Sequence, residues 1–196
     1  MKTLKNTTIV KSGCLDEDLN IFYSESSDGR LYTIRQPRRR DIREHKRAWK
    51  QVNDVHKGRF RRKEAPPWLY TVNQRSQRPR YRGEIPGIVP LIIEVDNEIV
   101  GFSDAYFIHG AELGERYQVE PEDRCANFGM TVLDGMQGMG IGTYYAKTSN
   151  AMARHYNCKW ILGETFVNGG LYWIRKKDNW ELLGTYEGKA VHRKLL

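Results

Sequence analysis

A glycine-rich hexapeptide in the last third of the chain constrains the fold most. Residues 137–142 read Gln-Gly-Met-Gly-Ile-Gly and lie between a strand-like segment, 125–133, and a segment with helical periodicity that starts at Ile141. The first turn of a helix leaves backbone N–H groups unpaired, and small residues let a phosphate approach them closely. The sequence therefore predicts a strand, a pyrophosphate-binding turn and a helix, in that order.

Two common phosphate-binding motifs do not fit this spacing. A P-loop has Lys and then Ser or Thr after its second glycine, whereas Ile141 follows Gly140. A dinucleotide-binding turn has the spacing Gly-x-Gly-x-x-Gly in an early βαβ unit. Here the spacing is Gly-x-Gly-x-Gly, after segments that indicate antiparallel strands. A turn that serves only helix packing remains the alternative without a ligand.

The chain as a whole indicates one domain of mixed strands and helices. Its 196 residues, 39% of them apolar, suffice for one sizeable core. Residues 1–30 predict an N-terminal extension or hairpin with strands at 8–10 and 21–24, and residues 31–196 predict the main domain. Its predicted strands are 31–35, 91–95, 98–108, 125–133, 160–167, 180–186 and 190–195, and its predicted helices start near Pro37, at Ile141 and after Gly170.

The pattern Gln-x-x-Gly-x-Gly, formed by Gln137, Gly140 and Gly142, resembles the acyl-CoA signature of the GCN5-related N-acetyltransferase (GNAT) superfamily. The order of elements from residue 31 onwards agrees with that resemblance. The resemblance implies an α/β (α+β) fold with a mixed, mostly antiparallel central sheet flanked by helices. It also implies an N-acyltransferase that moves an acetyl or similar acyl group from CoA to an amine. In this family the strand before the turn, here Phe128 to Val132, splays from its neighbour and binds the pantetheine arm.

The resemblance also implies which residues bind acetyl-CoA or another acyl-CoA. The predicted coenzyme-binding residues are Met130, Val132, Gln137, Gly138, Met139, Gly140, Ile141, Gly142, Thr143, Asn168 and Arg175. The family often has a tyrosine where this chain has Arg175, and a glycine where it has Asn179. Tyr172, one helical turn before Arg175, is a candidate for the phenol that protonates the departing thiolate, and its alternative role is that of a core aromatic residue.

The proposed transfer needs a base if the acceptor is an amine with a pKa of about 10.4, because such an amine is almost entirely protonated at neutral pH. The predicted catalytic residues are Asp104, Tyr172, Asn127 and Glu164, and Tyr106 is a further candidate. Asp104 is the first choice because it interrupts the apolar segment 100–108, where a carboxylate is either functional or paired. For each of the candidates on strands, the alternative is a strand-end residue that faces solvent or an arginine. Cys125 is a weak candidate for a nucleophile.

The net charge of +8 is concentrated in about a quarter of the chain. Residues 35–84 contain seventeen Lys or Arg and five acids, 17 − 5 = +12, and the remainder contains fifteen and nineteen, 15 − 19 = −4. Trp68, Tyr70 and Tyr81 lie among these arginines, a combination that binds phosphates and stacks on bases. The region favours a nucleic acid, or a protein attached to one, as the acceptor. A solvated basic surface, a small-molecule amine acceptor and a non-catalytic module that binds RNA or DNA remain the alternatives.

We expect a soluble, cytoplasmic protein without a metal or a membrane segment. No apolar run approaches the roughly 18 residues of a membrane helix, and residues 1–14 are too polar for a signal peptide. Cys14, Cys125 and Cys158 are too far apart to indicate a disulfide framework or a zinc site. The sequence leaves a monomer and a homodimer open.

Overall fold

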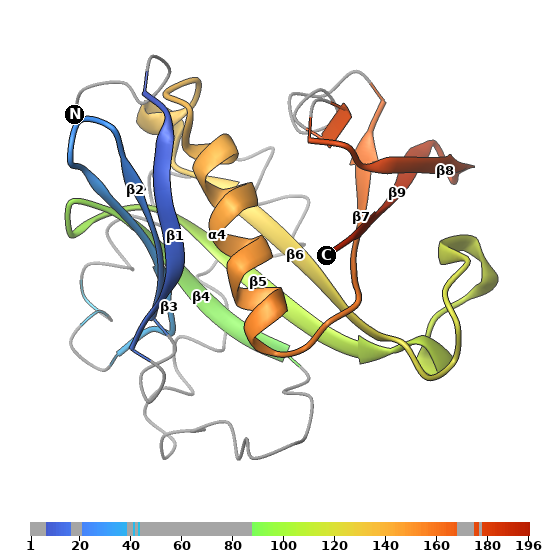
Figure 1. Cartoon of the computed structure of the whole chain (residues 1–196). Coiled ribbons are helices and arrows are strands. Elements are labelled where there is room, and N and C mark those ends of the chain that lie inside the picture. The colour runs from blue at the N-terminus through green and yellow to red at the C-terminus, as the bar shows by residue number, and fades with distance from the viewer. Residues whose placement is uncertain are drawn as a thin grey trace.

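The computed structural model describes residues 7–16, 21–38, 41, 43, 88–167, 175–176 and 178–196. Within these residues, nine strands form one sheet in the order β1-β2-β3-β4-β5-β6-β7-β9-β8, and helix α4 lies across one face of it (Figure 1). The neighbouring strands are antiparallel except for β6 and β7, which are parallel. The expected mixed, mostly antiparallel fold is confirmed.

The predicted N-terminal hairpin is present. β1 (Ile9–Asp16) and β2 (Ile21–Ser26) pair antiparallel, and β2 also pairs with β3 (Leu31–Arg35), so the hairpin extends the central sheet. β1 is longer than the predicted strand at 8–10. The helix predicted to start near Pro37 and the aromatic residues of the basic region lie outside the described residues.

The second predicted hairpin is formed by β4 (Ile88–Val95) and β5 (Glu98–His109). The two turn residues, Asp96 and Asn97, have φ values of 52° and 68°. Positive φ at both central positions gives a turn whose twist matches that of the flanking strands, and Asn and Asp adopt it more readily than most residues. β4 begins three residues before the predicted start of the strand and contains Pro90.

The segment around the glycine-rich turn follows the predicted order. β6 (Arg124–Val132) is followed by α4 (Ile141–His155) and then by β7 (Trp160–Phe166). α4 contacts β1, β2, β3 and β6. Its apolar stripe is buried because the helix covers the sheet with one face. The stripe consists of Ile141, Tyr144, Tyr145, Met152 and Ala153.

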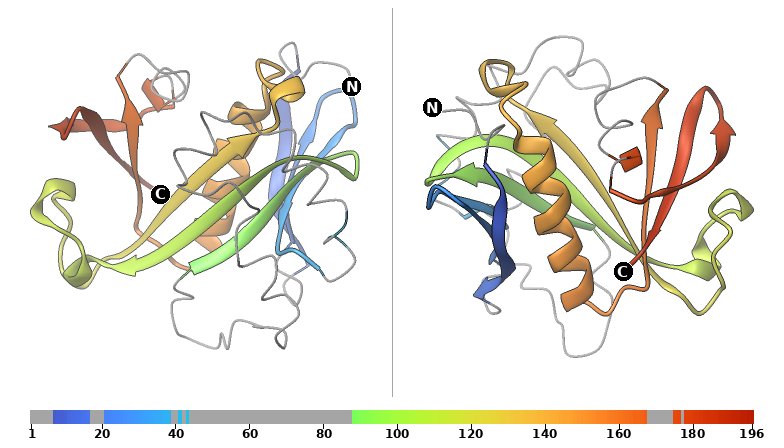
Figure 2. Two further views of the ribbon diagram at one scale, coloured as in Figure 1. Left: turned by 180° about the vertical axis from the view of Figure 1, so that it is seen from behind. Right: turned by 45° about the horizontal axis from the view of Figure 1, so that its top comes forward.

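The C-terminal strands complete the sheet in an order that differs from their order in the chain. β9 (Lys189–Leu195) lies between β7 and β8 (Glu181–Tyr186) and pairs antiparallel with both (Figure 2). Asn179, at the position where the family has a glycine, has a φ of 57°, so an asparagine supplies the left-handed conformation there. In the described part of the chain, no helix has the length and apolar character that crossing a membrane requires.

Candidate active site

β6 and β7 form a fork, which we define as residues 128–132 of β6 and 163–166 of β7. The ladder between these parallel strands runs from Cys125 to Asn127 on β6 and from Trp160 to Leu162 on β7. Beyond these pairs both strands continue, and they diverge toward their C-terminal ends (Figures 1 and 2). The predicted splay of the strand that precedes the glycine-rich turn is therefore confirmed.

The glycine-rich turn lies at the open end of the fork, where β6 leads into α4. Gly138 has a φ of 73°, and Gly140, the residue that precedes α4, has φ 90° and ψ 0°. A Cβ at Gly138 would contact no atom within 4 Å, so this glycine is needed for its backbone conformation and not for tight packing. No side chain caps the first turn of α4. The start of α4 is therefore suited to an anion.

Of the predicted coenzyme-binding residues that the structure describes, all except Arg175 lie on the end of β6, in this turn or at the start of α4. Met130 and Val132 are partly buried on β6, Ile141 is buried at the start of α4, and Gly138 and Thr143 are exposed. The Gln137 side chain donates a hydrogen bond to Asp134 Oδ1 at 3.1 Å, which braces the turn. Asn168 and Tyr172 lie outside the described residues, so their roles stay predictions.

A tyrosine that the sequence analysis did not select ties α4 to the fork. Tyr145 of α4 is buried against the sheet, and its hydroxyl donates a hydrogen bond to the carbonyl of Gly129 at 2.9 Å. The Ser103 hydroxyl bonds to the same Tyr145 oxygen. Burial raises the pKa of Tyr145 well above its usual range, so the phenol stays protonated. This clamp joins α4 to β5 and β6 on one face of the sheet.

The predicted bases lie on the opposite face. Side chains alternate along a strand, and directly paired residues share a face. Since Ser103 faces α4, Asp104 faces away from it, next to Gly129 in the ladder. Asn127 is paired with Tyr106 and Leu162, which places Asn127 and Glu164 on this face as well. The structure thus brings three of the four predicted catalytic residues to one face around the fork.

The oxygens of Glu164 are already engaged. The Tyr117 hydroxyl donates a hydrogen bond to Oε1 at 3.0 Å, Arg116 lies 3.1 Å from the same atom, and Lys189 lies 3.5 Å from Oε2. The pKa of Tyr117 is raised to about 12, mainly by burial and to a smaller extent by the nearby Glu164 carboxylate. These contacts favour a structural role for Glu164 and leave Asp104 and Asn127 as the stronger candidates.

Cys125 is unsuited to nucleophilic chemistry. It is fully buried, and its Sγ lies 3.8 Å from the carbonyl oxygen of Asp123. Burial, with a smaller contribution from Asp123, raises the pKa of the thiol to about 12, so the thiolate is scarce at neutral pH. These surroundings agree with the expectation that Cys125 is a weak candidate for a nucleophile.

Arg175 is buried on the α4 side of the sheet, with 5% of its surface exposed. Its guanidinium lies 4.5 Å from the ring of Trp180 and occupies the space where a side chain at Gly163 would lie, because a Cβ there would collide with it. Gly163 directly follows Leu162, the last residue of β7 paired with β6. The guanidinium therefore lies at the closed end of the fork. A glycine within an apolar strand was the sequence signal for such a close approach.

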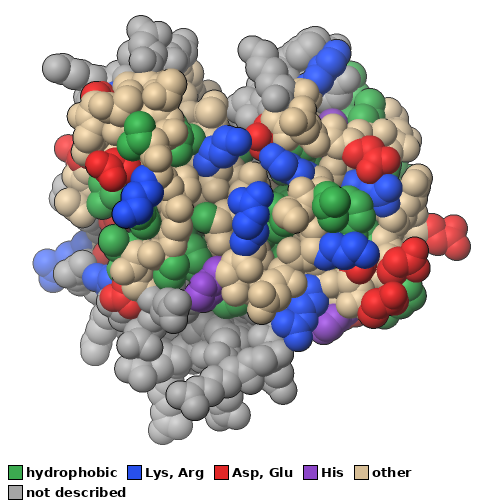
Figure 3. Space-filling model, viewed as in Figure 1, with side chains coloured by type: hydrophobic (Ala, Val, Ile, Leu, Met, Phe, Trp, Pro, Cys, Tyr) green, Lys and Arg blue, Asp and Glu red, His purple; other side chains and the backbone are tan. Residues whose placement is uncertain are grey.

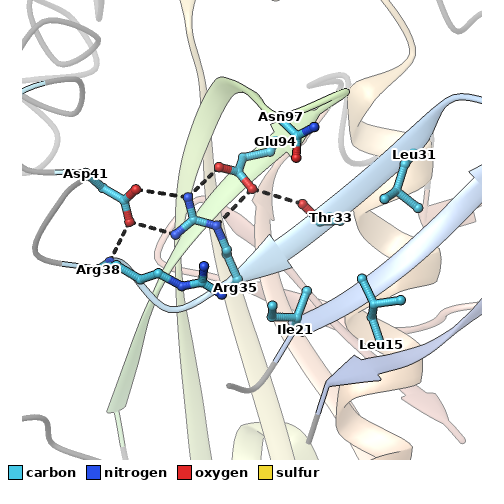
Figure 4. A pocket seen from close by; sticks show the side chains of 9 residues that line it. All are labelled: Leu15, Ile21, Leu31, Thr33, Arg35, Arg38, Asp41, Glu94 and Asn97. Atoms are coloured by element: carbon cyan, nitrogen blue, oxygen red, sulfur yellow. Dashed lines mark hydrogen bonds and ion pairs between the residues drawn. The ribbon is translucent and has the colours of Figure 1, made fainter. Parts of the chain in front are cut away.

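A second buried arginine corrects the description of the basic region. Arg35 donates hydrogen bonds to Asp41 at 2.6 and 3.0 Å and to Glu94 Oε2 at 2.9 Å, and all three residues are buried (Figure 4). They border a cavity of about 440 Å³ on β1–β4, away from the fork, which is also lined by Leu15, Ile21, Leu31, Thr33, Arg38 and Asn97. Arg35 therefore belongs to the interior of the fold and is not part of a basic binding surface.

The surface that carries α4 shows several lysine and arginine side chains across its middle (Figure 3). Helix α4 carries two exposed basic residues, Lys147 and Arg154. Lys147 forms an ion pair with Asp178 at 2.9 Å, which connects α4 to the segment before β8. In the same view the surface is notched at the top, beside the start of α4 (Figure 3).

Comparison with known structures gives matches that cover most of this chain. The GNAT domain of S. lividans PAT has 17% identity and a TM-score of 0.62 over 86% of this chain and 93% of that chain. The aminoglycoside acetyltransferase AAC(6')-Ib, solved with coenzyme A, has 16% identity and a TM-score of 0.56 over 84% and 94%. The microcin C7 self-immunity acetyltransferase MccE, solved with acetyl-CoA and AMP, has 15% identity and a TM-score of 0.56 over 84% and 92%.

These structures share the fold of this chain at identities too low to carry over their substrates. A search of curated protein sequences gave no significant match. The sequence profile of the acetyltransferase (GNAT) family, in contrast, matches residues 49–186, which is more than half of the chain. The chain therefore belongs to the acetyltransferase (GNAT) family of acetyl-CoA-dependent enzymes.

Proposed function

We propose that this enzyme binds acetyl-CoA with the pyrophosphate at the turn 137–142 and the pantetheine arm along β6 inside the fork. The observation that carries the proposal is the early end of the β6–β7 ladder, at Asn127 and Leu162, combined with the uncapped start of α4 at the open end. An extended ligand can bind backbone groups of a strand that lacks a neighbour. The thioester then lies toward the closed end of the fork.

The acceptor amine approaches from the face opposite α4 and attacks the thioester carbon directly. Asp104 of β5 and Asn127 of β6 lie on that face. Asp104 takes the proton that the amine loses as the carbon–nitrogen bond forms, and Asn127 orients the amine or a water molecule. Holding the two reactants together supplies much of the rate enhancement. Asp104 supplies the general-base contribution.

The base assignment predicts a large loss of rate on Asp104→Asn. A carboxamide cannot accept the amine proton, so we expect the acceptor-dependent release of thiol from acetyl-CoA to fall about 10²–10⁴-fold. The affinity for CoA should stay unchanged, because Asp104 faces away from α4. Glu112→Gln, an exposed residue in the turn after β5, removes the same charge as a control. A rate for Asp104→Asn within threefold of that control, roughly, would assign the base to another residue.

The coenzyme site predicts loss of CoA binding on Gly140→Asp. The new carboxylate adds bulk and negative charge where the pyrophosphate binds. Gly29→Asp is the matched control, because Gly29 has a φ of 80° and lies in the β2–β3 turn, with no atom within 4 Å of a Cβ there. Titration calorimetry with CoA should show binding for the control and none for Gly140→Asp. Equal affinities would contradict the proposed site.

The acceptor of this proposal is a polyanion or a protein bound to one. With Arg35 assigned to the interior, residues 36–84 contain sixteen basic residues and five acids, 16 − 5 = +11. Binding to a nucleic acid releases counterions, so its affinity should fall steeply with salt concentration. Filter binding of single- and double-stranded RNA and DNA at several salt concentrations tests this choice. A flat response, with turnover of a small amine instead, would assign a small-molecule acceptor.

A further inference from the structure

Arg175 is a buried cation for which the proposed function above provides no task. In a protein interior a charge is costly unless a partner of opposite charge compensates for it. Nη1 of Arg175 is buried and has no hydrogen-bond partner among the described residues. No carboxylate in that part of the chain forms an ion pair with it. The nearby Glu164 carboxylate is instead bound by Tyr117, Arg116 and Lys189.

The cation is retained in the charged form despite this burial. Burial lowers the pKa of Arg175 to about 10, and the neighbouring Tyr145, Tyr117 and Glu164 oppose that shift. At neutral pH the guanidinium is still protonated. An uncompensated but charged group of this kind indicates that its counter-charge comes from outside the described residues, and a ligand in the fork can supply it.

The position of the guanidinium at the fork determines which part of a bound acetyl-CoA would lie next to it. The pyrophosphate would lie at the open end of the fork, at the start of α4, and the pantetheine arm would run along β6 from Val132 toward Asn127. The thioester end would then lie near Gly163, at the closed end, where the guanidinium lies. The group nearest to Arg175 would therefore be the thioester sulfur.

We propose that Arg175 stabilises the coenzyme thiolate that leaves during transfer, an inference that rests on the proposed function. The acceptor nitrogen bonds to the thioester carbon, the carbon–sulfur bond breaks, and its electron pair stays on sulfur. The amine proton goes to Asp104. Arg175 donates no proton, and the sulfur departs as a thiolate paired with the guanidinium. This step needs no phenol to protonate the sulfur.

The proposal predicts that CoA bound to the wild-type enzyme has an unusually acidic thiol. A free thiol has a pKa of about 8.5, and an adjacent cation lowers such a value by about 1–3 pKa units. The thiolate absorbs ultraviolet light, so a pH titration of the CoA-saturated enzyme measures this pKa directly. A parallel titration with desulfo-CoA, which lacks the thiol, subtracts the contribution of the three cysteines of the protein.

Two variants assign the effect to Arg175. Arg175→Gln should return the pKa of the bound thiol to about 8.5, and Lys176→Gln, which removes the same charge from an exposed neighbour, should leave it low. Both variants should bind desulfo-CoA as the wild type does. Arg175→Lys should give an intermediate thiol pKa, because the lysine keeps the positive charge but lacks the planar guanidinium with its several N–H donors.

The outcomes separate this inference from the proposed function. If the wild-type enzyme binds CoA and the thiol pKa is that of free CoA, the inference is wrong and the coenzyme site stands. The same conclusion follows if Arg175→Gln folds and keeps an acidic bound thiol. If CoA does not bind at all, the proposed function fails first. If Arg175→Gln does not fold, the wild-type titration and Arg175→Lys decide.

Discussion

Two arginines are buried to almost the same extent in this fold, and their surroundings differ. Arg35, on β3, is 6% exposed, and Arg175, before β8, is 5% exposed. Arg35 is bound by two carboxylates, those of Asp41 and Glu94. Arg175 lies against Trp180 and Gly163, and the described residues offer it no carboxylate partner. Burial alone therefore does not distinguish an arginine that supports the fold from one that serves a ligand.

The acid–base properties of the two side chains show the same contrast. Burial opposes the charged form of Arg35, but the hydrogen bonds with Asp41 and Glu94 outweigh it and raise the pKa above its usual range. Burial lowers the pKa of Arg175 to about 10. The charge of Arg35 is thus balanced within the protein, whereas the charge of Arg175 is available for an anion.

The largest difference should appear in the stability of the protein without coenzyme. Arg35→Met leaves Asp41 and Glu94 buried without their cation, and we expect the free energy of unfolding to fall by about 3–5 kcal/mol. Arg175→Met, a substitution of the same kind, leaves no buried carboxylate unpaired and should change it by less than about 1 kcal/mol. Urea denaturation of both variants measures the difference. A loss for Arg175→Met as large as that for Arg35→Met would show that Arg175 is structural.

A smaller loss of stability is expected from a substitution at Gly163, the residue against which the Arg175 guanidinium lies. Gly163→Ala places a methyl group where the guanidinium lies, and overpacking of this kind costs about 1–3 kcal/mol of stability. The cost should be smaller in the Arg175→Met background, because the flexible thioether can move away. Denaturation of the two single variants and the double variant gives this coupling. Additive effects would mean that Gly163 and Arg175 do not compete for the same space.

The contrast also shows which parts of the structure the sequence could predict. Strand and helix positions follow from local periodicity, so β3, α4 and the turn at Asp96 and Asn97 agree with the predictions. The boundaries were less accurate: β4 begins at Ile88, three residues before the predicted start of the strand at residue 91. Local sequence patterns span only a few residues, which is enough to predict the position of a strand, a helix or a turn.

The properties of the two arginines depend on residues distant in the chain and could not be read from such patterns. Arg35 is joined to Glu94, 59 residues away, and was counted with the basic region as part of the range 35–84. Arg175 was placed at the coenzyme by resemblance, but neither its burial nor its contact with Gly163 follows from its neighbours in sequence. The fork could be expected only from the resemblance, because the length of the β6–β7 ladder is set by tertiary contacts.

The smallest expected effect concerns His192, which is buried on β9 next to Arg175. The pKa of His192 is lowered to about 4, mainly by burial and to a smaller extent by the positive charge of Arg175. The Nε2 atom of His192 lies 3.1 Å from the Thr165 hydroxyl. An unfolded histidine has a pKa of about 6.5, so between pH 6.5 and 4 the unfolded chain binds a proton that the folded chain does not. This contribution to stability is complete above pH 6.5, roughly, and is lost as the pH falls toward 4.

Arg175→Met removes the smaller of the two causes, so the pKa of His192 should rise by about one unit at most, and stability should fall less between pH 6.5 and 4 than in the wild type. That difference amounts to less than about 1.4 kcal/mol. Lys176→Met, the exposed neighbour, should reproduce the wild-type pH dependence. The Glu164 carboxylate also lies near Arg175, so a measurement on the His192 ring itself separates the two contributions. A nuclear magnetic resonance titration of the His192 ring measures the same pKa directly. An identical value in the wild type and in Arg175→Met would mean that the charge of Arg175 is already neutralised before any coenzyme binds, and the contrast with Arg35 would then disappear.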